Sequence, residues 1–299
     1  MNTQPSYFSV YLKLIVATLL WGGTWVAAHI LVEEAPPFTG AFTRLIVAVA
    51  ILAWMVWRQE GGFPPLNWHS GRTVFWMGFT GFFLYSFFFL TGLQHISAGH
   101  GALIIALNPV LIALVAWLWF KEPMTALKGA GILTALAGCI LVISNGHPEK
   151  FLQGDIGVGE LLILGCVASW AAYTFIGQRA TKTLSPLVAT FYASAVGLIL
   201  LGFASFSEKP WLLIPQFSLM TWLCLLYLGL FGTAIAYTLF TDSVKIIGAA
   251  RAAPFINLTP IFGVLFSALL LNERLHIMVL IGGLVTITGV MMTVWQRAK

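Results

Sequence analysis

The polar positions of this 299-residue chain are confined to short breaks between long apolar runs. A helix rises 1.5 Å per residue, so about 20 apolar residues cross the roughly 30 Å hydrocarbon core of a bilayer. The breaks between the runs carry proline, glycine or charged residues, as turns do. The pattern predicts an all-α polytopic membrane protein with ten transmembrane helices, at residues 12–32, 39–57, 73–94, 98–120, 126–144, 158–179, 186–206, 219–241, 247–271 and 276–296.

Composition and charge support a membrane protein and orient it. The chain is 59% hydrophobic and only 8% charged, whereas soluble domains carry about 25% charged residues. Of the fifteen Lys and Arg residues, Arg44 lies within a span, and Lys150, Lys209 and Arg274 fall on one side of the membrane. The other eleven fall on the opposite side, which the positive-inside rule assigns to the cytoplasm together with both termini. The net charge of +5 therefore needs no nucleic-acid partner; the expected partner is the lipid bilayer.

An internal repeat divides the chain into residues 1–150 and 151–299, with five predicted spans in each half. Trp21 and Trp170 are 149 residues apart, and the offset becomes 151 in the later spans. The larger offset relates Gly78 to Gly229, Gly81 to Gly232, Phe89 to Phe240, Pro109 to Pro260, Glu122 to Glu273, Gly131 to Gly282 and Gly138 to Gly289. Because five is an odd number, the second half enters the membrane inverted relative to the first. Inverted repeats are typical of secondary transporters, whose substrate site lies near the midplane between the repeats.

Two prolines interrupt predicted spans at matching places in the halves. Pro109 lacks an N–H and is expected to free the carbonyl of Ile105, and Pro260 is expected to free that of Ile256. Such a kink persists within a bilayer only against protein or a water-filled cavity. The sequence therefore predicts that Pro109 and Pro260 let two kinked helices gate a central site.

The two five-span halves, Trp21-Gly22-Gly23, the proline kinks and the Glu122/Glu273 pair resemble the EamA-type members of the drug/metabolite transporter superfamily. The resemblance covers essentially the whole chain, and the sequence looks particularly similar to the bacterial YddG amino-acid exporters. It implies a multi-pass protein of the bacterial inner membrane that exports aromatic and other neutral amino acids. The alternative that the resemblance leaves open is a multidrug carrier or another metabolite carrier, such as a nucleotide-sugar carrier.

Aromatic and polar side chains are predicted at midplane depth, although Trp and Tyr usually gather at the membrane interface. Spacings of three or four residues place such pairs on one helix face. These residues favour a pocket for a flat amphiphilic substrate, with ordinary helix packing as the alternative. The candidate substrate-binding residues are Trp21, Thr24, Trp25, Tyr85, Asn108, Trp170, Tyr173, Tyr237, Asn257 and Thr259. Asn108 and Asn257 would bind the ammonium and carboxylate groups of a zwitterion, or else join helices and satisfy the carbonyls freed by the prolines.

Charged residues in the spans narrow the substrate class. Arg44 would bind a substrate carboxylate, or snorkel towards the surface or pair with Glu160; its predicted depth near one end of the span favours the structural roles. All ten Asp and Glu residues fall at or near helix ends. Proton-coupled exporters of cationic drugs usually need a carboxylate within the membrane, so this pattern favours neutral or zwitterionic cargo.

The remaining patterns concern scaffold and chemistry. Gly131, Ala135 and Gly138 share a helix face, and their counterparts in the last span predict that spans five and ten pack together away from the cavity. No metal-ligand spacing and no catalytic constellation is present, so no enzyme, cofactor or metal is expected. These patterns are compatible with a monomeric transporter. The sequence leaves open the oligomeric state, the exact substrate, the coupling ion and the direction of net flux.

Overall fold

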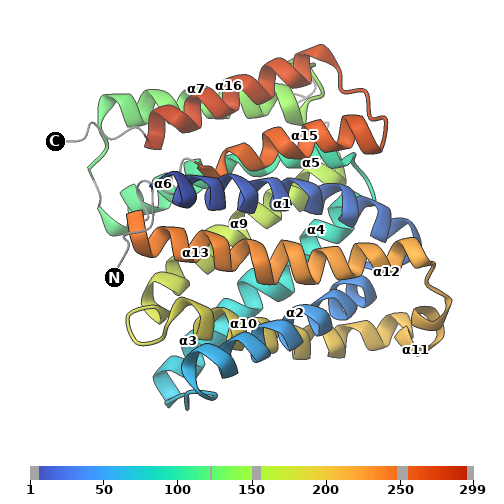
Figure 1. The fold of residues 1–299 in the computed structure, drawn as a ribbon. Helices are drawn as coiled ribbons and strands as arrows, with labels where there is room; N and C mark the ends of the chain where they lie inside the picture. The colour runs from blue at the N-terminus through green and yellow to red at the C-terminus, as the bar shows by residue number, and fades with distance from the viewer. Residues whose placement is uncertain (1–6, 122, 150–155, 248–254, 295–299) are drawn as a thin grey trace.

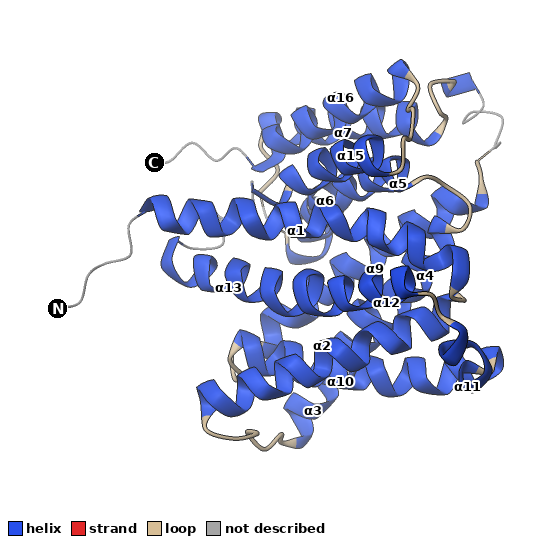
Figure 2. Ribbon diagram, turned by 45° about the vertical axis from the view of Figure 1, so that its right-hand side comes forward, coloured by secondary structure: helices blue, strands red, loops and turns tan. Residues whose placement is uncertain are grey.

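The computed structural model describes residues 7–121, 123–149, 156–247 and 255–294, and within them all regular structure is helical (Figure 2). The elements are α1 (Tyr7–Glu34), α2 (Pro37–Glu60), α3 (Trp68–Gly78), η1 (Phe79–Leu84), α4 (Tyr85–Leu93), α5 (Ala98–Ile104), η2 (Ile105–Leu107), α6 (Asn108–Phe120), α7 (Ala126–Ile143), α9 (Val158–Ala180), α10 (Pro186–Ser205), η3 (Phe206–Glu208), α11 (Pro210–Leu213), η4 (Ile214–Gln216), α12 (Leu219–Leu226), η5 (Tyr227–Ile235), α13 (Ala236–Ile247), α15 (Leu258–Leu270) and α16 (Ile277–Val294). Elements η1 and η5 are π-helical, and η2, η3 and η4 are 3₁₀ turns.

Eight helical segments in the described ranges are long and apolar enough to cross a membrane by length and composition. They begin and end within a few residues of the first eight predicted spans. Two shorter apolar helices, Leu258–Leu270 and Ile277–Thr293, occupy the places of the predicted ninth and tenth spans. The first part of the ninth span and the position of Glu122 lie outside the described residues. The count of ten spans stays a prediction.

The helices form a stack of layers (Figure 1). Helices α7 and α16 form the layer at one side, and α2, α3 and α10 form the layer at the other. Helices α1, α5, α9 and α15 lie between these layers, and the start of α1 and the end of α16 share one end of the stack. The central helices therefore surround the middle of the molecule, while the two outer layers support them.

Large apolar side chains cover the outside of the stack as well as its core. Leu133 on α7 is 70% exposed and Leu269 on α15 is 66% exposed, whereas Leu90 and Leu225 are fully buried. Helices that are apolar all round suit an environment of lipid outside and close packing inside. Hydrophobicity on all sides of a helix therefore predicts a span but does not determine which face of that helix is buried. The shapes of the packed side chains determine the buried face.

Small residues determine which faces of α7 and α16 pack together. A Cβ added at Gly131 would lie 2.6 Å from the carbonyl oxygen of Gly289, and one at Gly282 would lie 2.8 Å from that of Gly138. These distances are too short for any side chain, so glycine lets the two backbones touch along their length. The predicted pairing of spans five and ten is confirmed.

The internal repeat extends from sequence to packing. A Cβ added at Gly78 would lie 2.6 Å from the Cβ of Val196, and one at Gly229 would lie 2.8 Å from that of Val47. The glycines are 151 residues apart and the valines 149 apart, as in the sequence repeat. The contact of span three with span seven is therefore repeated by the contact of span eight with span two.

The first proline kink is resolved by a change of helix type. Helix α5 ends at Ile104, a 3₁₀ turn covers the next three residues, and α6 starts at Asn108 with Pro109 in its first turn. The main-chain N–H of Asn108 donates to the carbonyl of Ile105. The expectation that Ile105 loses its partner is corrected, because the tighter turn supplies a donor three residues later. Pro260 likewise lies in the first turn of α15, after a break at Asn257.

Carboxylates bind helix starts at the end of the stack opposite the start of α1 (Figure 1). Glu273 accepts hydrogen bonds from the first N–H groups of α5, at 2.8 Å from Ala98 and 2.9 Å from Gly99. Glu208 binds the start of α2 in the same way, and Glu34 binds the start of α12. Since helix starts carry unpaired N–H groups and a partial positive charge, each carboxylate ties two distant segments together.

Candidate functional site

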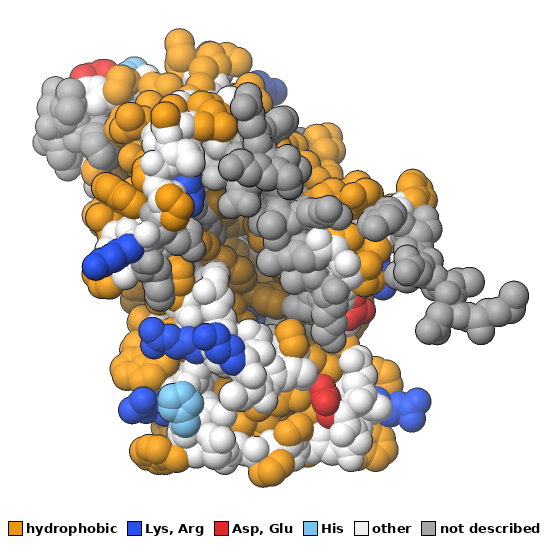
Figure 3. Space-filling model, turned by 90° about the vertical axis from the view of Figure 1, so that its left-hand side faces the viewer, with side chains coloured by type: hydrophobic (Ala, Val, Ile, Leu, Met, Phe, Trp, Pro, Cys, Tyr) orange, Lys and Arg blue, Asp and Glu red, His pale blue; other side chains and the backbone are white. Residues whose placement is uncertain are grey.

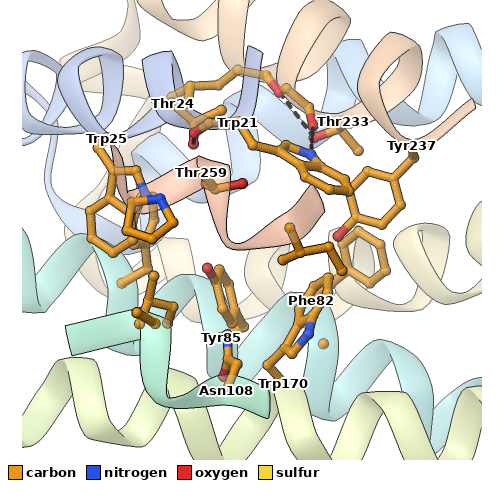
Figure 4. Close-up of a pocket in the computed structure, with 18 of the residues that line it drawn as sticks. Trp21, Thr24, Trp25, Phe82, Tyr85, Asn108, Trp170, Thr233, Tyr237 and Thr259 are labelled. Atoms are coloured by element: carbon orange, nitrogen blue, oxygen red, sulfur yellow. Dashed lines mark hydrogen bonds between the residues drawn. The ribbon is translucent and has the colours of Figure 1, made fainter. Parts of the chain in front are cut away.

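A cavity lies at the centre of the stack, where segments of both halves meet (Figure 4). It contains about 980 Å³ of space not filled by atoms, including its open mouth. Its walls come from α1, α2, the η1–α4 and η5–α13 segments, the two proline kinks and α9. The lining residues are Trp21, Thr24, Trp25, Arg44, Gly81, Phe82, Tyr85, Phe89, Ile105, Ala106, Asn108, Pro109, Trp170, Leu228, Gly232, Thr233, Tyr237, Ile256, Asn257, Thr259 and Pro260.

The structure brings the sequence-predicted residues together around this space, with one exception. Tyr173 does not line the cavity, because its ring lies over Gly81 and packs edge-on against Phe82 at 6.0 Å. Its spacing of three residues from Trp170 turns it about 60° around the helix, which is enough to move it behind the wall. Whether the remaining residues bind substrate stays a prediction.

Four aromatic rings form a chain of contacts around the cavity (Figure 4). The ring of Tyr237 lies 5.4 Å from that of Trp21, at an interplanar angle of 78°, and 6.4 Å from that of Trp170. Trp170 also contacts Tyr85 at 5.9 Å. These edge-to-face and tilted arrangements suit aromatic quadrupoles, and all of these rings line the cavity, where a flat substrate could pack against them.

The wall formed by α1 is held to the second half by hydrogen bonds to main-chain carbonyls. The indole N–H of Trp21 donates to the carbonyl of Gly232 at 3.0 Å, in the π-helical segment η5. The hydroxyl of Tyr227 donates to the carbonyl of Leu20 at 2.9 Å. The π-helix makes the first bond possible, since its wider turn displaces the usual donor of the Gly232 carbonyl.

Arg44 brings a permanent positive charge to the cavity. Its Nη2 donates to the Ser86 hydroxyl at 2.7 Å, while its Nε is buried without a hydrogen-bond partner in the described part of the chain. No ion pair joins Arg44 to Glu160 among the described residues. The expectation of a snorkelling or Glu160-paired side chain is therefore corrected: Ser86, which is fully buried, holds the guanidinium inside.

The amides and hydroxyls at the kinks differ in their bonding. The Oδ1 of Asn108 and the Oγ1 of Thr259 are buried and lack hydrogen-bond partners among the described residues. Asn257 places its Nδ2 3.7 Å from the sulfur of Met291, which is a weak contact. Because the main chain of Asn108 already satisfies Ile105, the side chain of Asn108 is not needed to make the kink tolerable.

Sequence reasoning missed several lining residues. Gly81 and Gly232 are recognisable only as a repeat pair, and the π-helices in which they lie leave no periodic signal in a run that is apolar all round. Phe82, Phe89 and Leu228 read as ordinary core residues. The one signal in the sequence that could have identified these two glycines is the internal repeat, which relates Gly81 to Gly232.

The charges of the lining define what the cavity can bind. Within the described lining, Arg44 is a cation, and no Asp or Glu accompanies it. No group of three or more potential metal ligands occurs among the described residues. An aromatic cavity with one fixed cation suits an amphiphilic small molecule that carries an anionic group, and it disfavours cations.

Comparison with known proteins assigns the family. Residues 8–144 and 157–295 each match the EamA-like transporter family, so the chain belongs to this family and carries two copies of its repeat. It is 28% identical to the uncharacterized transporter YyaM of Bacillus subtilis, with 95% of this chain and 93% of that protein covered. It is 30% identical to an uncharacterized transporter of Archaeoglobus fulgidus, with 95% and 96% covered.

More distant similarities support the same family and fold. A WAT1-related chloroplastic protein of Arabidopsis thaliana is 27% identical, with 95% of this chain and 69% of that protein covered. A solved crystal structure with 19% sequence identity superimposes with a TM-score of 0.65 over 96% of this chain and 98% of its own, which shows a shared fold.

The chain is thus a multi-pass membrane transporter of the EamA-like family and not an enzyme. The relatives from Bacillus subtilis and Archaeoglobus fulgidus are named as uncharacterized transporters, and these names indicate no cargo. These relatives support the EamA-like family, but they do not support a specific similarity to the YddG amino-acid exporters.

Proposed function

We propose that this protein exports neutral and aromatic amino acids, or closely related small metabolites, across the bacterial inner membrane by alternating access. In this proposal ten helices form two inverted five-helix repeats with both termini in the cytoplasm. The observation that carries it is the lining of the central cavity, where aromatic rings from both halves surround a single described cation, Arg44. The rings accept a flat apolar side chain, and the cation attracts a carboxylate.

The position of the cavity supports alternating access. Its lining draws on both halves and on both proline kinks, which is where inverted-repeat transporters bind substrate. At one end, Glu273 ties the segment that follows α15 to the start of α5, and Glu34 ties α1 to the start of α12. At the other end, the face in Figure 3 is hollowed near its middle, with hydrophobic side chains at depth and Lys and Arg side chains to its left and below it. These features favour a conformation open towards the cytoplasm.

The cavity also separates the proposal from its rival. A carrier of cationic drugs needs a carboxylate in the binding site, and the described lining contains none. A nucleotide-sugar carrier needs several cations for its phosphates, whereas Arg44 is a single one. Neutral zwitterions and small organic acids remain as the substrate classes that the lining accommodates.

Proteoliposomes containing the purified full-length protein test this proposal. Labelled phenylalanine, tryptophan, alanine, lysine and a cationic dye are exchanged across the membrane, with and without an imposed proton gradient and with protein-free liposomes as the control. We expect saturable transport of the neutral amino acids and none of the dye. Transport of the dye with none of the amino acids would overturn the proposal in favour of a drug carrier.

A further inference from the structure

The carbonyl of Gly232 does not receive the main-chain hydrogen bond that it would accept in a regular α-helix. In an α-helix the N–H of Ala236 would bond to this carbonyl four residues back. Instead it reaches five residues back to Phe231, because η5 is π-helical up to Ile235. The Gly232 carbonyl is thereby available to a donor from another helix, and the indole of Trp21 occupies it at 3.0 Å.

The first half contains the same device at Gly81, 151 residues earlier. Segment η1 is π-helical up to Leu84, and the N–H of Tyr85 is directed at the carbonyls of Thr80 and Phe82. The carbonyl of Gly81, like that of Gly232, therefore does not receive the N–H of the residue four positions later. The repeat thus preserves a local irregularity of the backbone, and Gly81 and Gly232 both line the cavity.

The donor of the second pair is present but not docked. Trp170 corresponds to Trp21 in the repeat, yet its indole makes no hydrogen bond within the described part of the chain, and its ring lies against Tyr85 at 5.9 Å. Tyr237 contacts both indoles, at 5.4 Å from Trp21 and 6.4 Å from Trp170. Each half therefore has a tryptophan donor, and each has a glycine carbonyl that could accept its hydrogen bond. Only the bond from Trp21 is formed among the described residues.

The residue that lies beside each glycine also differs between the halves. Thr24 lies beside Gly232, and a Cβ added to that glycine would be 2.6 Å from its methyl group. Tyr173 is the repeat counterpart of Thr24, and its ring covers Gly81. A small threonine thus lies beside the glycine whose carbonyl is bound by an indole, and a larger phenol ring lies beside the glycine whose carbonyl is not.

We propose that Trp21–Gly232 and Trp170–Gly81 are the two positions of one conformational switch. In the conformation described here, Trp21 is docked and Trp170 is released. In the opposite conformation, Tyr173 moves off Gly81, Trp170 docks there, and Trp21 leaves Gly232. Because the proposed function requires the inverted halves to exchange conformations, this inference rests on alternating access, but it is independent of the identity of the cargo.

Hydrogen exchange of the indole N–H groups tests the switch directly. The full-length protein is labelled with ¹⁵N in its twelve tryptophans and studied in lipid nanodiscs, and Trp21→Phe and Trp170→Phe assign the two signals. In the unmodified protein, the indole hydrogen of Trp21 should exchange about tenfold more slowly than that of Trp170, as expected for loss of one buried hydrogen bond.

Two variants then shift the equilibrium. Trp21→Phe keeps an aromatic ring but removes the donor, so the Trp170 signal should become about tenfold more protected, whereas Trp170→Phe should leave Trp21 protected. Tyr173→Thr makes the second half resemble the first and should also protect Trp170, which provides a second test if Trp21→Phe does not fold. Unchanged rapid exchange of Trp170 in the folded variants would overturn the proposal.

The measurement needs no substrate, which separates it from the test of cargo. Failure of amino-acid transport in proteoliposomes would remove the proposed substrate while leaving the exchange rates unaffected. Conversely, amino-acid transport with a permanently unprotected Trp170 would retain the proposed function and reject the switch.

Discussion

The guanidinium of Arg44 donates to the hydroxyl of Ser86 at 2.7 Å across the interface of α2 and α4. Ser86 is fully buried, and the described lining offers Arg44 no carboxylate. A charge in the interior is costly unless it is paired, so an anionic group of the cargo would complete its environment. Arg44 is therefore the residue that we expect to set the charge preference of the cavity.

Replacing Arg44 should discriminate between cargo with and without a carboxylate. We expect Arg44→Ala to raise the KM for phenylalanine by about 10- to 100-fold, which corresponds to the loss of a charge-assisted hydrogen bond of roughly 1.5–3 kcal/mol. Transport of phenylalaninamide, which lacks the carboxylate, should not fall. Equal losses for both compounds in proteoliposomes would show that Arg44 is purely structural.

Ser86→Ala tests whether the orientation of Arg44 matters. Loss of one hydrogen bond, about 1 kcal/mol, should raise the KM for phenylalanine by about fivefold and leave kcat within about a factor of two. Ser169→Ala is a suitable control, because Ser169 is a similarly buried serine on α9 that does not line the cavity. A KM in Ser86→Ala that matches the control would contradict a positioning role.

The tryptophans of the cavity wall are expected to be needed for transport rather than for assembly. Trp21→Ala and Trp170→Ala should each lower kcat/KM by at least about tenfold, since a stacking aromatic surface is worth roughly 0.5–1.5 kcal/mol beyond its buried area. Amounts of protein in the membrane should stay near normal. Trp119→Ala is the matched control, because Trp119 is 75% exposed on the outside of the stack. Normal transport by both cavity variants would remove the pocket assignment.

The sequence predicted those parts of the fold that depend on repetition and hydrophobicity. The offset between Trp21 and Trp170 anticipated two equivalent halves, and the family match to residues 8–144 and 157–295 confirms the repeat. The aromatic residues at midplane depth do meet at one cavity. What the sequence could not predict was local hydrogen bonding within apolar helices, because such runs have no polar face to fix their rotation.

The π-helices illustrate this limit. A π turn adds one residue without changing the composition, and at Gly232 the indole of a tryptophan 211 residues away makes use of the altered bonding. Arg44 shows the same dependence on tertiary structure: its depth in the sequence favoured the membrane surface, and a buried serine on another helix holds it inside. Tyr173 was expected in the cavity because it shares a helix face with Trp170, but three residues of spacing placed it behind the wall.

The contact of α7 with α16 should be the most sensitive part of the scaffold. A Cβ added at Gly289 would overlap the main chain of Ala135 and lie 2.6 Å from the carbonyl of Gly131. Since backbone atoms cannot rotate away, Gly289→Ala should destabilise the protein by roughly 1–3 kcal/mol, measured as a lower melting temperature in detergent.

A matched glycine makes this prediction specific. Gly129 lies on the same helix as Gly131, and a Cβ added there would meet nothing within 4 Å. Gly129→Ala should therefore stabilise the protein by roughly 0.5–1 kcal/mol through helix propensity. If Gly129→Ala and Gly289→Ala shift the melting temperature equally, then close backbone packing does not hold α7 to α16.

Removing the charge of Glu273 should weaken the end of the molecule opposite the start of α1. Both carboxylate oxygens accept main-chain N–H groups of α5, so Glu273→Gln loses one acceptor and the attraction of the helix dipole, together about 1–2 kcal/mol. The first turn of α5 should then show faster amide exchange than in the unmodified protein, whereas α7 should not change. Glu149→Gln is the control, because Glu149 is 60% exposed and its carboxylate contacts His147 near the surface. If α5 keeps its protection in Glu273→Gln, the Ser97 hydroxyl, which accepts from the N–H of His100 at 3.3 Å, is sufficient to cap the helix and Glu273 is dispensable there.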